Sequence, residues 1–263
     1  MSTLSYQGTT ALITGASSGL GAEFARQWAE RGADVVLVAR RLDRLEGLAT
    51  ELEKTYRVKA TPVAADLARP GAGTALRDEL DARGIAVHTL INNAGFGSHG
   101  AFLEQDPAQV TEMIQLNITA VADLTRAFLP RLAADGRGAL VTVASTAAYQ
   151  PTPAMAVYGA TKAFVLHFTE ALAYETRGSG LRVLTVSPGP VETEFFDVVG
   201  TRDAVVGRVS TAVDVVTAAR RALERRSTPP SVVAGLGNRL SAAAVRLAPR
   251  RVVLTLAGRS LKA

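Results

Sequence analysis

A tyrosine and a lysine stand four positions apart in the stretch AVYGATKAF, residues 156–164. Four residues make slightly more than one turn of an α-helix, so Tyr158 and Lys162 are predicted to share a helix face. A phenol has a pKa of about 10, too high for proton exchange near neutral pH. A lysine ammonium about 4 Å away in a sheltered cleft would lower that pKa enough for acid–base chemistry. The alternative is a chance spacing on a surface helix.

A glycine-rich segment, TGASSGLG at residues 14–21, directly follows an apolar run. A strand that leads through such a turn into a helix cradles phosphate, because the first N–H groups of the helix point at the anion. Gly15 would allow the tight turn, and Gly19 and Gly21 would let backbone and helix approach each other. The alternative is a turn that only connects strand and helix. We predict dinucleotide binding by Thr14, Gly15, Ser17, Ser18, Gly19, Leu20 and Gly21.

The end of the next apolar run, in VLVARRLDRL, indicates which dinucleotide to expect. An NAD site usually offers a carboxylate to the ribose hydroxyls at this point. This chain has Ala39, Arg40 and Arg41 there instead, and an arginine fork matches the 2′-phosphate of NADP. We therefore predict NADPH in preference to NAD, with Arg40 as a contact. The alternative is that both arginines are solvated residues at the start of a helix.

Short apolar runs alternate with helical patterns along the chain and must position these residues. The runs predict strands at residues 10–15, 34–40, 58–66, 88–95, 138–145 and 181–189, with a weaker seventh at 231–235. Strands that are apolar throughout are buried on both faces, which is typical of a parallel sheet covered by helices. We predict an α/β fold: a single Rossmann-type, doubly wound domain with a mostly parallel sheet of six to seven strands.

Two other segments stand out from this alternation. Asp106 and Pro107 are a cap and a first helical residue, and they predict a long helix that runs to about Leu132. Residues 189–210 show no clear periodicity and are too long for an ordinary connection, so we expect a mobile flap over a substrate pocket.

The composition excludes several classes of protein. The 263 residues include no cysteine and three histidines, so we expect no disulfide and no metal site. The net charge is +5, yet residues 1–224 hold 21 basic against 24 acidic residues, while residues 225–263 hold eight basic residues and no acidic one. A folded body without a basic patch argues against nucleic-acid binding. No long apolar run is present, so we expect a soluble cytoplasmic protein.

Six signals occur together in one order: TGASSGLG, NNAG at 92–95, Asn117, Ser145, YGATK at 158–162 and SPGPVET at 187–193. With them the chain resembles the short-chain dehydrogenase/reductase family over about residues 8–225. The resemblance implies that Tyr158 is the proton donor and acceptor and that Lys162 lowers its pKa and binds the nicotinamide ribose. It implies that Ser145 holds the substrate oxygen and that Asn117 holds a water for proton supply.

The resemblance also implies further coenzyme contacts. Asp66 would accept from the adenine amino group, and Asn93 would lie near the adenosine ribose. The nicotinamide would be held by Pro188, Gly189, Val191 and Thr193. A homodimer or homotetramer built through the helices that begin at Pro107 and near Tyr158 is implied as well. His99, just after NNAG, is expected to be a solvated loop residue.

The chain departs from the family pattern at its end. We expect residues 1–230 to form the Rossmann-type domain and residues 231–263 a basic amphipathic helical extension of it. Helical spacing places four apolar residues on one side of that extension and two arginines on another: Leu236, Leu240, Ala243 and Leu247, with Arg239 and Arg246. Three placements stay open: wrapping the body and flanking the pocket, covering an acidic face of a partner subunit, or lying on an anionic membrane surface. We favour packing on the body.

Together these features predict an NADPH-preferring oxidoreductase that moves hydride between the nicotinamide and a carbonyl or secondary alcohol. Reduction is the expected direction. The apolar flap and extension favour a lipophilic ketone, such as a 3-oxoacyl chain, a steroid-like ketone or a polyketide-type ketone. The alternative is a coenzyme-binding regulatory or membrane-surface scaffold protein without turnover.

Overall fold

The computed structural model describes residues 4–201 and 209–261. Within these residues a seven-stranded, fully parallel sheet has the order β3-β2-β1-β4-β5-β6-β7. The strands are β1 (Thr10–Thr14), β2 (Asp34–Ala39), β3 (Ala60–Ala64), β4 (Thr89–Asn92), β5 (Ala139–Val143), β6 (Arg182–Ser187) and β7 (Ser231–Val233). All seven predicted strands are confirmed, and their observed ends lie up to three residues inside the predicted ones.

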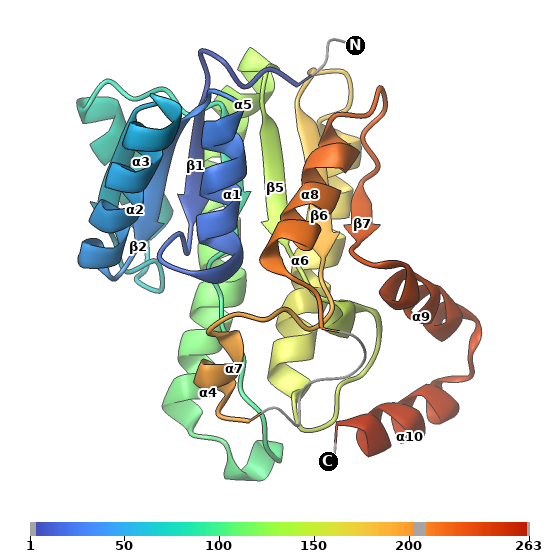
Figure 1. Ribbon diagram of the computed structural model, residues 1–263. Coiled ribbons are helices and arrows are strands. Elements are labelled where there is room, and N and C mark those ends of the chain that lie inside the picture. Colours follow the sequence, from blue (N-terminus) through green and yellow to red (C-terminus); the bar gives the residue numbers. More distant parts are fainter. Residues whose placement is uncertain (1–3, 202–208, 262–263) are drawn as a thin grey trace.

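Helices cover both faces of the sheet (Figure 1). The described helices are α1 (Gly19–Glu30), α2 (Leu42–Tyr56), α3 (Ala72–Ala82), α4 (Pro107–Ile114), α5 (Ala120–Asp135), α6 (Ala156–Glu175), α7 (Phe195–Val199), α8 (Ala212–Leu223), α9 (Leu236–Leu247) and α10 (Arg250–Ser260). Short 3-10 turns lie at η1 (Phe102–Glu104) and η3 (Thr146–Tyr149), and a π-turn at η2 (Gln115–Thr119). None of the helices described here is long and apolar enough to cross a bilayer.

Alternate residues of each strand enter two separate cores, because successive side chains point to opposite faces. Ile13 of β1 packs with Phe24 and Trp28 of α1 on the face that α2 and α8 also cover. Leu12 packs with Leu124 of α5 on the opposite face, together with parts of α3 and α6. The sheet is therefore buried on both sides, as a strand pattern of continuous apolar residues predicts.

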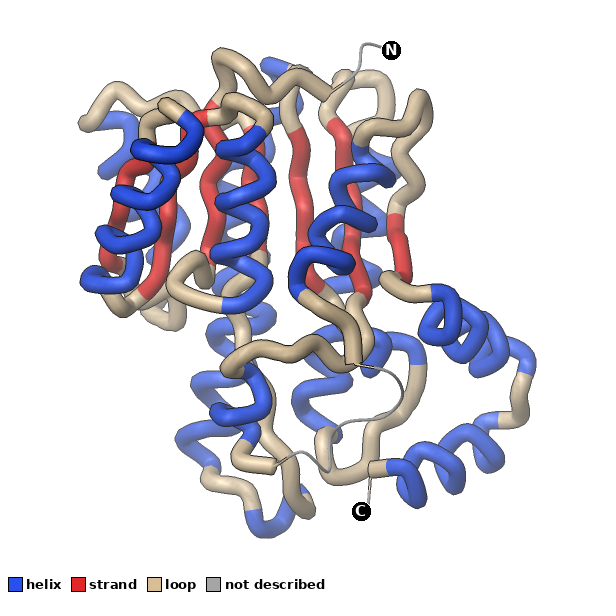
Figure 2. Tube along the Cα trace, viewed as in Figure 1, coloured by secondary structure: helices blue, strands red, loops and turns tan. Residues whose placement is uncertain are grey.

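The strand order reverses between β1 and β4. Leu12 of β1 pairs with Val36 of β2 on one side and with Leu90 of β4 on the other. The crevice at the carboxyl ends of strands beside such a reversal is the usual ligand site of this architecture. Figure 2 shows these ends pointing toward the part of the molecule that holds α4, α7, α9 and α10.

The long helix predicted from Asp106 is present but interrupted. The Asp106 carboxylate caps it by accepting from Ala108 N at 3.0 Å, and Pro107 is its first residue. A π-turn at Gln115–Thr119 separates α4 from α5, and the helix ends at Asp135 before Gly136, three residues beyond the predicted end.

The predicted flap at residues 189–210 contains a short helix, α7, and a bridge between Val191 and Ser210. Residues 202–208 of it lie outside the described residues. Part of this segment therefore has regular secondary structure. The sequence did not predict the helix, because five residues are too few to show a helical repeat of apolar residues.

The C-terminal extension forms an arm of two helices, α9 and α10, that leaves the sheet after β7 (Figure 1). The predicted break at Pro249 is confirmed. The apolar stripe at Leu236, Leu240 and Leu247 points outward, with exposed fractions of 73%, 63% and 90%. Small and polar residues, including the buried Ala242, face the body instead.

Candidate active site

The glycine-rich turn after β1 leaves room for backbone only. Gly15 has a φ of +66°, and a methyl group on it would lie 2.8 Å from the Asn93 amide nitrogen. A methyl group on Gly21 would overlap the Gly15 carbonyl oxygen and lie 2.7 Å from the same nitrogen. Larger residues would fill the space in which α1 begins, so the observed turn matches the predicted phosphate cradle.

Asn93 and Thr14 hold this turn to the neighbouring strand. Asn93 Nδ2 donates to the Thr14 carbonyl at 2.8 Å, and Thr14 Oγ1 accepts from the backbone N–H groups of Asn93 and Ala94 at 2.9 and 3.0 Å. Asn93 also lines the cavity described below, whereas Thr14 does not. The Thr14 hydroxyl therefore has a structural role: it joins the glycine-rich turn to the loop after β4.

The two arginines after β2 point to different partners. Arg40 Nη1 donates to Glu112 of α4 at 3.1 Å. Arg41 Nη2 donates to the hydroxyl oxygens of Ser17 and Ser18 at 2.9 and 3.2 Å, which places its guanidinium on the phosphate cradle. Arg41, more than Arg40, is thus the cation beside the predicted coenzyme phosphates.

An acidic residue from the flap reaches Arg41 as well. Glu194 accepts from Arg41 at 3.0 Å and from Arg44 of α2, about 150 positions earlier in the chain. Hydrogen bonds from Arg44 and Arg41 lower the pKa of the Glu194 carboxyl, so it is charged at neutral pH. These ion pairs tie the start of α7 to the coenzyme end of the cleft.

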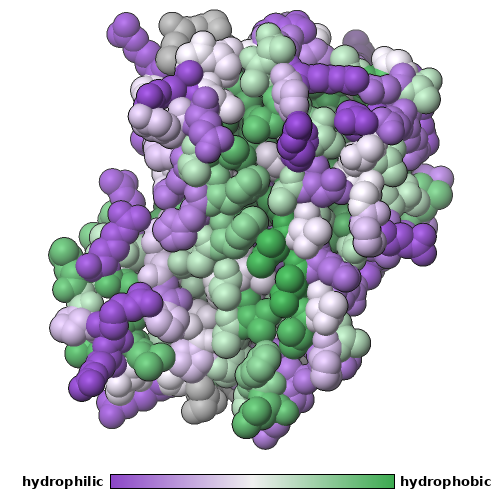
Figure 3. All heavy atoms as spheres, turned by 180° about the vertical axis from the view of Figure 1, so that it is seen from behind, coloured by the Kyte–Doolittle hydropathy of each residue, from purple (hydrophilic) through white to green (hydrophobic). Residues whose placement is uncertain are grey.

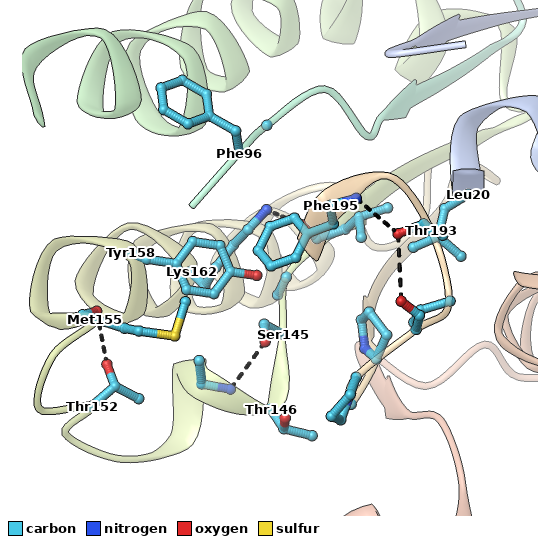
Figure 4. A pocket seen from close by; sticks show the side chains of 18 of the residues that line it. Leu20, Phe96, Ser145, Thr146, Thr152, Met155, Tyr158, Lys162, Thr193 and Phe195 are labelled. Carbon is cyan, nitrogen blue, oxygen red and sulfur yellow. Dashed lines mark hydrogen bonds between the residues drawn. The ribbon is translucent and has the colours of Figure 1, made fainter. Parts of the chain in front are cut away.

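At the other end of the cleft, Ser145, Tyr158 and Lys162 come together (Figure 4). Ser145 follows β5 and caps η3, accepting from Ala147 N at 3.1 Å. Tyr158 and Lys162 share the face of α6 that looks toward the sheet, and both are buried. Lys162 Nζ donates to the Val143 carbonyl at 2.9 Å and lies 5.9 Å from the centre of the Tyr158 ring.

The pKa of Tyr158 was expected to fall, but in this structure it rises. Burial raises the pKa of Tyr158 to about 12, and a hydrogen bond with Ser145 opposes that rise only in part. Burial also lowers the pKa of Lys162 to about 8, because it penalises the ammonium. The shared helix face was predicted correctly, but burial dominates the pKa of both side chains.

Asn117 lies in the middle of the π-turn and is fully buried. Its Oδ1 accepts from Phe96 N at 3.1 Å, and its Nδ2 donates to the Phe96 carbonyl at 2.9 Å and to Thr161 Oγ1 at 3.0 Å. The widened turn therefore aims the amide across to α6, where Thr161 lies beside Lys162. π-Turns often mark functional positions, but the sequence carries no sign of this one.

The loop after β6 approaches the cleft from the side of α9. Thr193 Oγ1 accepts from Phe195 N at 3.3 Å, and it lies 3.5 Å from the Val191 carbonyl (Figure 4). A methyl group on Gly189 would meet the Asn238 side chain of α9. The arm is thus packed directly against the loop predicted to hold the nicotinamide.

One cavity of about 900 Å³ joins all these parts. Most of the predicted site residues line it: Gly15, Ser17, Ser18, Gly19, Leu20, Arg40, Asp66, Asn93, Ser145, Tyr158, Lys162, Pro188, Gly189, Val191 and Thr193. Thr14, Gly21 and Asn117 lie behind its wall and shape it through the contacts given above. Among the described residues no cluster of His, Cys, Asp or Glu side chains is arranged to hold a metal ion.

The wall beside the Tyr158 ring is apolar. The Phe195 ring lies 5.4 Å from the Tyr158 ring, centre to centre. Met155 of the η3–α6 loop and Leu261, at the end of α10, pack in the same cluster. The expectation that the extension packs on the body and flanks the pocket agrees with this placement of α10, whose buried residues Val253, Ala257 and Leu261 recur every four positions.

His99 was expected to be solvated, and this is wrong. It is partly buried, and its Nε2 lies 2.9 Å from the Leu261 carbonyl oxygen. The loop after β4 and the end of α10 are therefore in direct contact beside the cavity.

Comparison with known proteins agrees with this geometry. The short chain dehydrogenase family pattern matches residues 9–203. The chain belongs to the short-chain dehydrogenase family. It is 41% identical over 191 residues to sulfoacetaldehyde reductase 2 of Chromohalobacter salexigens, covering 70% of this chain and 73% of that protein. It is 32% identical to very-long-chain 3-oxoacyl-CoA reductase-A of Danio rerio, covering 72% of this chain and 60% of that one.

Solved structures of the family extend the likeness over most of the chain. A short-chain dehydrogenase from Sphingobium yanoikuyae in complex with NADPH is 36% identical with a TM-score of 0.79, covering 91% of this chain and 93% of that one. A 7beta-hydroxysteroid dehydrogenase is 28% identical with a TM-score of 0.85, covering 98% of this chain and all of that one. As a member of this family of dehydrogenases and reductases, the protein is an oxidoreductase that uses a nicotinamide coenzyme.

Proposed function

We propose that the protein is an NADPH-preferring oxidoreductase that transfers hydride between the nicotinamide and a carbonyl or secondary alcohol of a lipophilic small molecule. The observation that carries this is the single cavity that joins the phosphate cradle to Ser145, Tyr158 and Lys162. We do not favour the alternative of a scaffold protein without turnover, because binding alone does not require three such polar groups to converge on one apolar pocket.

Each polar group has a role in that reaction. A bound nicotinamide coenzyme supplies or accepts the hydride. In reduction the Tyr158 hydroxyl gives its proton to the carbonyl oxygen, while Ser145 Oγ donates a hydrogen bond to the same oxygen as negative charge grows there. Lys162 would hold the nicotinamide ribose. Asn117 keeps the loop after β4 and α6 in register, because its amide is bonded to Phe96 and Thr161.

The charge at the coenzyme end supports a preference for NADPH. Ala39 stands where a carboxylate would bind the ribose hydroxyls of NAD, and Arg40 and Arg41 line the cavity beside it. Their guanidinium groups provide the fork that a 2′-phosphate binds. Asp66 lies on the cavity wall nearby, in a place suited to the adenine.

The protonation of Tyr158 supports reduction as the working direction. With a pKa of about 12, its phenol is protonated at neutral pH, so the donor form is the one present. A nearby positive charge has to lower this pKa before proton transfer is efficient. Oxidation needs the phenolate, which requires a nearby positive charge to offset the burial.

The walls of the pocket favour a lipophilic substrate over a small polar one such as sulfoacetaldehyde. Phe96, Met155, Phe195 and Leu261 belong to one apolar cluster with the Tyr158 side chain, and all four line the cavity. Apolar walls of this kind select for apolar area on the ligand. A 3-oxoacyl, steroid-like or polyketide-type ketone fits this requirement.

We infer that the enzyme works as a homodimer or homotetramer in the cytoplasm, associated through α4–α5 and α6, and that its arm contacts membranes. Figure 3 shows a band of apolar side chains down the face opposite to the view of Figure 1. On α6, the stacked rings of Phe164 and Phe168 are only partly buried. Such surface is typical of a subunit interface.

The test is to follow NADPH absorbance against a panel of ketones, comparing the parent enzyme with Tyr158→Phe. Loss of the hydroxyl should lower turnover by about 10²- to 10⁴-fold, the usual contribution of a general acid. NADPH affinity should stay within about twofold, because the ring remains in place. Tyr174→Phe is the matched control, since Tyr174 lies on the same helix and is 64% exposed.

Tyr158→Phe turnover equal to that of the parent enzyme would contradict the assigned role. Absence of NADPH binding by the parent enzyme would contradict the proposed function as a whole.

A further inference from the structure

The arm formed by α9 and α10 has two faces of opposite character. On α9, Asn238, Ala242 and Val245 face the body and line the cavity. Leu236, Leu240 and Leu247 lie on the other side of the same helix and are exposed. Single exposed leucines are ordinary on a protein surface, but a stripe of three along one helix is typical of a contact surface.

Arginines lie on both helices of the arm, and no acidic residue accompanies them; the Arg246 guanidinium also lies 5.9 Å from the centre of the Tyr149 ring of the body. Arg239 and Arg246 lie on α9, and Arg250, Arg251 and Arg259 on α10. Within the part of the chain that the structure describes, none of these five forms an ion pair with an acidic side chain. Figure 3 shows apolar and charged side chains side by side on the arm, at the lower left.

We propose that the outer face of the arm docks on an anionic membrane surface. Leucines on one side of a short helix sink into the boundary between headgroups and acyl chains, and neighbouring arginines bind lipid phosphates. The 12 residues of α9 are too short to span a bilayer and long enough to lie along its surface.

The same charge argues against a second copy of this chain as the occupant. A twofold contact through the outer face would bring the arginines of both arms together without an acidic partner on either. Lipid phosphates supply the missing negative charge.

The docking surface is continuous with the substrate pocket. The inner face of α10 presents Val253, Ala257 and Leu261 to the cavity. The exposed Leu254 and Leu256 adjoin Val253 and Ala257 in the chain, and Leu256 also lines the cavity. An arm lying on a bilayer therefore holds the pocket beside the lipid. Resting on the proposed function, this assigns the substrate to carbonyl compounds that partition into membranes.

The experiment is sedimentation of the full-length protein with vesicles of phosphatidylcholine alone and with vesicles that also contain phosphatidylglycerol. We expect binding to the anionic vesicles only, and weakening as salt is raised. The variant with Leu236, Leu240 and Leu247 changed to glutamine should lose at least about tenfold in partitioning. Val213→Gln, which alters an exposed residue of α8, should bind like the parent protein.

The three leucines do not line the cavity, so the triple variant should oxidise NADPH with a water-soluble ketone at the parent rate. This separates a failure of docking from a failure of the proposed function. Equal vesicle binding by parent and triple variant would overturn the proposal. So would a lower oligomeric mass of the triple variant in light scattering, since the leucines would then belong to a subunit interface.

Discussion

The phosphate cradle and the C-terminal arm flank the same cavity but are built by opposite means. At the cradle, the backbone of Gly15, the start of α1 and Asn93 fill the space, and no side chain fits at Gly21. On the arm, Gly237 of α9 has no atom within 4 Å of the place where a side chain would begin. One end of the site is therefore fixed by backbone geometry, and the other is formed by side chains on a helix pair at the edge.

This difference explains where the family pattern stops. It matches residues 9–203 and therefore includes the cradle and the tyrosine–lysine pair but not the arm. Enzymes that bind the same coenzyme share the backbone conformation around it, whereas the residues that line the substrate pocket differ from one enzyme to the next. The arm lies outside the matched residues and lines the other end of the cavity.

The strongest test of this contrast is the same substitution made at both ends. Gly21→Ala should weaken NADPH binding by about 10- to 100-fold, because the added methyl displaces the backbone of the cradle. Gly237→Ala should leave NADPH binding unchanged and should raise thermal stability slightly, since alanine favours a helix. Fluorescence titration with NADPH and thermal melts measure both. A coenzyme affinity unaffected by Gly21→Ala would show that the cradle tolerates side chains.

A second test separates the pocket wall from the coenzyme site. Leu261→Ala should raise KM for a lipophilic ketone by about tenfold, because it removes apolar contact beside Tyr158. NADPH affinity should not change, since Leu261 lies far from the cradle. Leu254→Ala, on the same helix but 49% exposed, is the control. Equal effects of the two variants on KM would mean that α10 acts through its folding and not through the pocket.

The smallest expected effect concerns the ion pairs that tie the flap to the coenzyme end. Glu194→Gln should tighten NADPH binding about threefold and leave NADH unchanged, because Arg41 and Arg44 are freed for the 2′-phosphate. Glu192→Gln, two residues earlier and exposed, is the matched control. Weaker NADPH binding by Glu194→Gln would show that the carboxylate orders the arginines and does not compete with the phosphate.

Much of the coenzyme end could be predicted from the sequence, because its signals are local. The cradle, the seven strands and the shared face of Tyr158 and Lys162 each follow from residues within one segment. The missed features depend on contacts between distant segments. Glu194 meets Arg41 across 153 positions, and burial of Tyr158 decides its pKa.

The side of α9 that faces the body could not be predicted from the sequence either. Helical spacing correctly groups Leu236, Leu240 and Leu247 on one side, but spacing alone does not tell which side meets the body. Asn238 packs against Gly189 and turns that side inward. The missing side chain at Gly189 therefore lets this side of α9 approach a loop that is distant in the sequence.

The strand order also has a consequence for how the chain folds during synthesis. β1 pairs with β2 and with β4, and Leu12 contacts Val36 and Leu90 in neighbouring positions. Until β4 leaves the ribosome, β1 is the bare edge of a three-stranded sheet with an apolar face. Such an edge is prone to pair with other chains, so slow translation or a chaperone that shields it should improve the yield of folded enzyme.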